Sequence, residues 1–88
     1  MTRDEIIKHL TDELEDELEG ICKYNTLYEA LEGLQMHDEA DRIERIASEE
    51  YYHAKILMDV LWMMNVDVSD HPKIKDDWAK VKHIFAIE

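Results

Sequence analysis

The sequence predicts an all-α protein, in which a hairpin of two long antiparallel helices is followed by a short third helix. Apolar side chains recur every three or four residues along two long segments, as they do on one face of a helix. A short polar turn joins these segments, and connections of that length usually link antiparallel neighbours. The 88 residues form one small domain with a modest core. We therefore expect the chain to associate with other chains.

The first helix is expected at residues 3–34. Thr2 and Glu5 form a capping-box pattern, in which the hydroxyl and the carboxylate each bond an early backbone N–H. Gly20 lies inside the helix and costs about 1 kcal/mol relative to alanine. One carboxylate, Glu17, occupies a core position in the apolar row, which consists of Ile7, Leu10, Leu14, Glu17, Ile21, Tyr24, Tyr28 and Leu31.

The second helix is expected at residues 38–65, after a turn in which Gly33 adopts a left-handed conformation and Asp38 caps the new helix. Burying an unpaired carboxylate costs several kcal/mol unless it finds a partner, a proton or a metal ion. One such interruption in each long row indicates that Glu17 and Glu50 meet. The second row consists of Met36, Ala40, Ile43, Ala47, Glu50, Ala54, Leu57, Leu61 and Met64.

The third helix is expected at residues 72–86. Pro72 suits its first turn, with Asp70 or His71 as the capping residue. A helix of this length is not stable alone, so we expect it to dock on the rest of the chain. Its apolar face consists of Ile74, Trp78, Val81 and Phe85.

The composition limits the partners that this chain can have. A formal net charge of -12, from 22 acidic and 10 basic residues, argues against nucleic acid or a membrane as partner and favours cations. The single cysteine, Cys22, provides neither a disulfide framework nor a Cys-x-x-Cys metal site, which fits a reducing compartment. No secretion signal or membrane span is visible, so a cytoplasmic location is expected. Phosphate loops and nucleophile elbows are absent from the sequence.

Glu50 and His53 form the pattern that points to chemistry. A Glu-x-x-His pair on a helix is the half-site of di-metal carboxylate proteins in helical bundles. A second copy, packed about a two-fold axis, would cover the apolar faces and complete the site in a four-helix bundle. Four glutamates and two histidines suit iron, with manganese or zinc as alternatives. Glu50 would bridge the ions, with Glu17 and His53 as terminal ligands; Glu13 is an alternative to Glu17.

Over roughly residues 14–62, the chain resembles the first half of the rubrerythrin and ferritin pattern. The resemblance is carried by Glu17, by Tyr24 seven residues later, and by Glu50-x-x-His53-Ala54-Lys55. A chain with one such helix pair is similar to the encapsulated ferritins, which complete a di-iron ferroxidase centre by dimerising and then assemble into rings. Lys23 stands where those proteins carry an aromatic residue.

The resemblance also implies roles around the ligands. Tyr24 would stand behind the ligands without binding metal, and the alternative is a tyrosine at the core edge with its hydroxyl in water. Glu19, together with Asp16, would form an outer site where ferrous ions pause. The alternative for these two acids is a solvated acidic face.

The expected function is that of a ferroxidase, which oxidises Fe(II) to Fe(III) with oxygen in iron storage or detoxification. The expected partners are a second copy, further copies in a ring, and an encapsulin shell enclosing the protein as a nanocompartment. The sequence after Phe85 shows no Gly- and Ser-rich tail with a shell-loading peptide. One alternative is a non-catalytic acidic helical module, whose Glu17 and Glu50 pair with Lys or Arg across an oligomer interface. Another is a rubrerythrin-like peroxide-reducing protein, although one cysteine cannot supply the cysteine-rich electron-transfer domain that such proteins carry.

Overall fold

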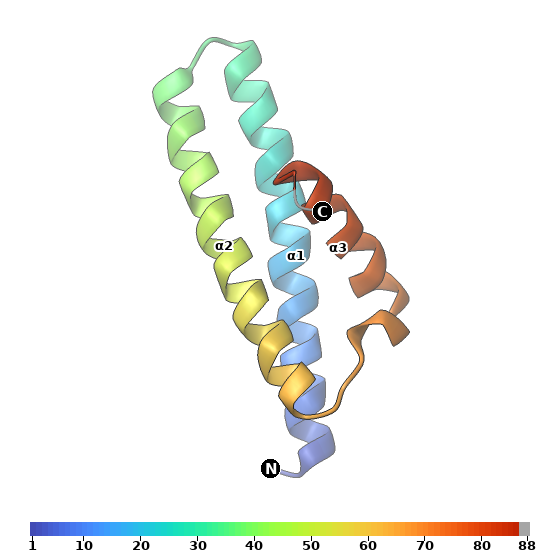
Figure 1. Ribbon diagram of the computed structural model, residues 1–88. Helices are drawn as coiled ribbons and strands as arrows, with labels where there is room; N and C mark the ends of the chain where they lie inside the picture. The colour runs from blue at the N-terminus through green and yellow to red at the C-terminus, as the bar shows by residue number, and fades with distance from the viewer. Residues whose placement is uncertain (87–88) are drawn as a thin grey trace.

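The computed structural model describes residues 1–86 as three α-helices and one short 3-10 turn (Figure 1). Helix α1 spans Arg3–Gly33, α2 spans His37–Met63 and α3 spans Pro72–Ile84, with the 3-10 turn η1 at Val68–Asp70. The first two helices run antiparallel, and α3 lies along the middle of α1. The predicted all-α class is confirmed, since residues 1–86 contain no strand.

The start of α1 agrees with the predicted capping box. The Thr2 hydroxyl accepts a hydrogen bond from the Glu5 backbone N–H, and the Glu5 carboxylate accepts one from the Thr2 backbone N–H. Pro72 is the first residue of α3, as expected, and His71 precedes it as the N-cap without a side-chain capping bond. At α1, the two Thr2–Glu5 contacts satisfy backbone donors that a helix start leaves unpaired.

The turn between α1 and α2 differs from the prediction. Gly33 remains helical, and Gln35 adopts the left-handed conformation instead, with φ 60°. Asp38 does not cap α2, because the helix already begins at His37 and its N-cap is Met36. Two backbone hydrogen bonds account for the left-handed residue: the Met36 N–H donates to the Leu31 carbonyl and the Gln35 N–H to the Glu32 carbonyl. This pattern closes a helix end without requiring glycine.

The other helices end two residues earlier than predicted for a similar reason. Asn65 and Ala86 have φ values of 61° and 53°, so each marks a left-handed residue just beyond its helix. The Val66 N–H donates to the Leu61 carbonyl and closes the end of α2 in the same manner as the end of α1. The backbone thus stops the helices where the apolar pattern alone would continue them.

The core lies between α3 and one face of the hairpin. Aromatic side chains join α2 to α3: the Tyr51 ring stacks on Trp78 with centroids 6.0 Å apart, and it lies 4.9 Å from the Phe85 ring. Docking of the third helix is therefore as expected, and we call this side of the hairpin the covered face. Its fully buried residues are Leu14, Leu18, Ile21, Ala54, Leu61, Ile74 and Val81.

The predicted apolar row of α1 is displaced toward α3. Leu18, which was outside that row, is fully buried, whereas Glu17 lies at the edge between the two helices. Cys22 is half-buried against the same core, and burial raises the pKa of its thiol. Periodicity located the apolar side of α1 to within about a third of a turn. The position of α3 determines which residues of that side are buried.

Helix α3 does not cover the opposite side of the hairpin, which we call the open face. It includes residues seven apart on α1, which share one side of a helix. Ile6 and Leu27 are 36% and 43% exposed at the two ends of this stripe, and Ile46 of α2 is 37% exposed. The α1 stripe consists of Ile6, Glu13, Gly20 and Leu27.

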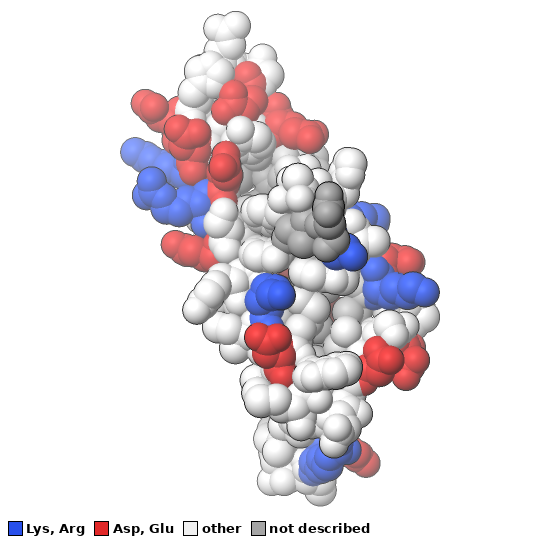
Figure 2. All heavy atoms as spheres, viewed as in Figure 1, with Lys and Arg blue, Asp and Glu red and all other residues white. Residues whose placement is uncertain are grey.

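The surface carries charges of both signs, with acidic side chains gathered near the hairpin turn and basic ones beside them (Figure 2). Within residues 1–86, no helix combines the length and the apolar character that crossing a bilayer requires.

Candidate metal centre

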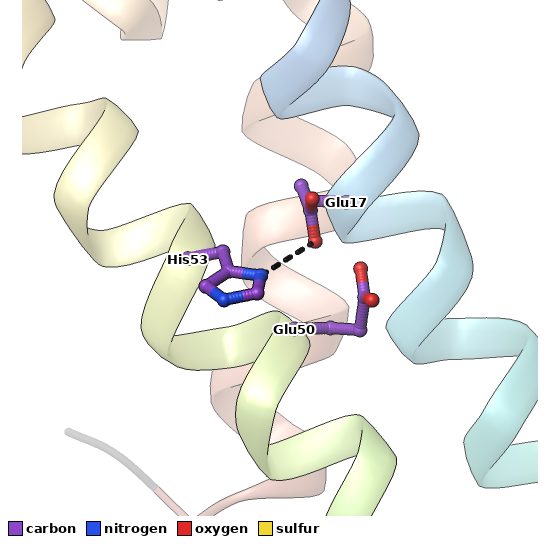
Figure 3. Close-up of side chains that lie close together, drawn as sticks. All are labelled: Glu17, Glu50 and His53. Atoms are coloured by element: carbon purple, nitrogen blue, oxygen red, sulfur yellow. Dashed lines mark ion pairs between the residues drawn. The ribbon is translucent and has the colours of Figure 1, made fainter.

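Three side chains converge at the middle of the hairpin. Glu17 extends from α1 toward α2, while Glu50 and His53 extend from successive turns of α2 toward α1 (Figure 3). One ligand atom from each residue lies within 4.8 Å of the other two. The Nδ1 atom of His53 is 3.9 Å from Oε2 of Glu17. The structure therefore brings together Glu17 and Glu50, which interrupt the two apolar rows, and His53, which completes the Glu-x-x-His pair.

The cluster lies on the open face, with α3 behind the hairpin in the view of Figure 3. Exposure differs between its members, since the Glu17 side chain is 13% exposed and that of His53 is 58% exposed. Ligands on two packed helices are held more precisely than ligands on loops. The exposed imidazole leaves the cluster accessible from outside the chain.

One oxygen of the cluster lacks a hydrogen-bond partner. The Oε2 atom of Glu17 is buried and accepts no hydrogen bond from the described residues. Burial raises the pKa of Glu17 to about 8, and the neighbouring carboxylates of Glu50 and Glu13 raise it further. Near neutral pH, Glu17 therefore tends to hold a proton that it would lose in the unfolded chain.

The donor set fits a divalent transition metal. Carboxylate oxygens and an imidazole nitrogen suit iron, manganese or zinc better than soft metals that prefer thiolates. A cation between Glu17 and Glu50 would replace the proton of Glu17 and offset the repulsion between the two carboxylates. Because the chain supplies three ligand residues here, ligand positions remain for a second set of residues, for water or for oxygen.

Tyr24 lies apart from the cluster. It lines a cavity of about 240 Å³ between the hairpin and the end of α3, and none of Glu17, Glu50 and His53 is among the residues that line this cavity. The role that the resemblance implies for this tyrosine remains a prediction. The cavity is lined by Tyr24, Asn25, Tyr28, Glu44, Ala47, Ile84 and Phe85.

The acids expected at an outer site are also outside the cluster. The Glu19 carboxylate pairs with Lys73 of α3 at 3.3 Å and with Lys23 at 3.4 Å, and the hydrogen bond from Lys73 lowers the pKa of Glu19. Asp16 is exposed. The Lys73 contact could not be found from the sequence, because no local signal places α3 beside Glu19.

No family model, curated protein or solved structure matches this chain. The feature of the chain that indicates a function is the arrangement of Glu17, Glu50 and His53.

Proposed function

We propose that this protein is a ferroxidase that binds two ferrous ions between two copies of the chain and oxidises them with oxygen. The observation that carries the proposal is the convergence of Glu17, Glu50 and His53 around a buried carboxylate oxygen without a hydrogen-bond partner. Burying this oxygen is costly in the single chain, and a cation offsets that cost.

The second copy follows from the incomplete ligand set and from the open face. A bundle di-metal site of the carboxylate type uses four glutamates and two histidines, and each chain supplies half of that set. Two-fold packing would place the same surface of each copy against the other. The exposed side chains of Ile6, Leu27 and Ile46 support such packing, because they offer apolar contacts around the cluster.

The outer side of α2 supports assembly beyond a dimer. Tyr52, Ile56 and Met63 are 66%, 46% and 73% exposed, and their spacing of four and seven places them on one side of the helix. This second apolar stripe is separate from the cluster. We therefore include a higher homo-oligomer in the proposal, and light scattering on metal-loaded protein measures its mass.

The proposed reaction is a two-electron transfer from substrate iron to oxygen. Each of two ferrous ions loses one electron, and one oxygen molecule takes up both electrons with two protons to give hydrogen peroxide. Glu17, Glu50 and His53 of each copy would hold the ions, with Glu50 as the shared ligand and Glu17 and His53 as terminal ligands. Because binding of a cation displaces the proton of Glu17, this residue can also release a proton near the reacting oxygen.

The test compares ferrous oxidation by three single variants. Glu50→Ala and His53→Ala should each reduce the catalysed rate to the rate of iron in buffer, measured by ferric absorbance after oxygen is added to anaerobically loaded protein. Glu49→Ala is the matched control, because this exposed acid precedes Glu50 on α2. It should retain the rate of the unmodified protein.

Unchanged rates in both Glu50→Ala and His53→Ala would refute the ferroxidase. Metal analysis of protein purified from iron-fed cells gives a second, independent result. A metal-free protein whose oligomer does not respond to iron would favour the non-catalytic helical module, in which Glu17 and Glu50 pair with basic residues of another copy.

A further inference from the structure

Gly20 lies one turn after Glu17 on the open face. A Cβ atom built at Gly20 would be 3.9 Å from Oε2 of Glu50, which is an ordinary van der Waals contact. Gly20 is also helical and does not have a positive φ. Neither the backbone conformation nor packing within the chain therefore requires glycine at this position.

Glycine in a helix interior destabilises the helix relative to alanine. Close approach of another backbone is one of the few structural reasons for glycine in a regular helix. Among residues 1–86, no backbone of another element approaches the empty position beside Gly20, whose nearest neighbour is the Glu50 carboxylate. The space beside Gly20 is therefore open to a group from outside the chain.

We infer that Gly20 is the place on α1 where a second copy of this chain approaches most closely, and that its missing side chain leaves room beside Glu50 for the partner's half of the metal site. The inference rests on the proposed function. Gly20 lies between Glu13 and Leu27 on the uncovered stripe of α1, so a helix packed against this stripe would meet a gap beside the cluster. Gly20 is a positioning residue and not a ligand.

The experiment uses the full chain and three variants. In Gly20→Ala, the added methyl group has room, so the metal-free protein should melt at a higher temperature and bind Co²⁺ like the unmodified protein. In Gly20→Leu, the gain in helix propensity is similar, but the longer side chain extends beyond the room that the Cβ position has. Affinity for Co²⁺, measured by its visible absorption, should fall at least tenfold. Light scattering should show a smaller dimer fraction.

Gly33→Leu is the matched control. Gly33 is the other glycine of the chain, a Cβ atom there meets nothing within 4 Å, and it lies about 20 Å from Gly20 along α1. This variant should retain both the Co²⁺ affinity and the dimer fraction. If Gly33→Leu lost as much Co²⁺ affinity and dimer fraction as Gly20→Leu, the inference would be overturned, because a bulky side chain elsewhere on α1 would then have the same effect.

Two further outcomes separate the inference from the proposed function. If the unmodified protein binds Co²⁺ at the cluster and Gly20→Leu binds it equally well as a dimer, the inference is overturned and the metal site stands. If the unmodified protein binds neither Co²⁺ nor Fe²⁺, both are overturned. Should circular dichroism show lost helicity in Gly20→Leu, Gly20→Gln replaces it with a polar side chain of similar length, and the same tenfold loss is expected.

Discussion

The two faces of the hairpin differ sharply, although neighbouring residues of the same helix form them. On the covered face, Leu18 is fully buried in a core that α3 completes. On the open face, the preceding residue, Glu17, holds a buried oxygen without a hydrogen-bond partner. The covered face stabilises the chain by itself. The open face retains an unfavourable carboxylate whose cost only a proton, a cation or another chain can offset.

The largest effect on stability is expected at the covered face. Leu18→Ala removes a fully buried side chain and should lower the free energy of unfolding by about 3 kcal/mol. Urea titration measures this loss. At temperatures where the variant is still folded, its affinity for Co²⁺ should be unchanged, because the Leu18 side chain faces α3. A parallel loss of metal affinity would show that the two faces are not independent.

A smaller effect is expected at Glu17, and it depends on pH. Its pKa is about 8 in the folded chain and near 4.5 in the unfolded chain, so the folded state binds more protons between these values. The stability of metal-free protein should therefore fall as the pH rises from 4.5 through 8, on the order of 1 kcal/mol between pH 6 and 8 after solvent screening.

Glu17→Gln should flatten this pH dependence, because the amide does not titrate. Urea unfolding at several pH values measures the slope. With saturating Co²⁺, the trend of the unmodified protein should reverse, since metal binding is favoured when the proton leaves. If the stability of the metal-free protein rose between pH 6 and 8, this result would contradict the raised pKa of Glu17.

The smallest effect is expected at Glu19. Its ion pairs with Lys23 and Lys73 lie at the surface, and such pairs contribute little because water screens them. Glu19→Gln should leave the unfolding midpoint within experimental error. Its equilibrium affinity for Co²⁺ at the cluster should also remain unchanged, as judged by the same absorption titration. A large drop would place Glu19 among the ligands, where the structure does not have it.

Local signals in the sequence predicted much of the fold and of the candidate site. Helical periodicity and the Thr2 capping box gave the all-α class and the start of α1, and the two interrupted apolar rows predicted that Glu17 and Glu50 meet. Periodicity describes a face relative to the helix's own axis and does not say which neighbour covers it. The burial of Leu18 and the contact between Glu19 and Lys73 depend on α3 and could not be derived in this way.

The helix ends have a practical consequence for protein engineering. All three helices are followed by a left-handed residue other than glycine: Gln35, Asn65 and Ala86. For Gln35 and Ala86, the Cβ atom is crowded in this conformation, and glycine would relieve that strain. Both positions lie at the tips of their helices, away from Glu17 and Glu50. They offer a way to build a more robust background, in which damaging changes around the carboxylates can be studied in folded protein.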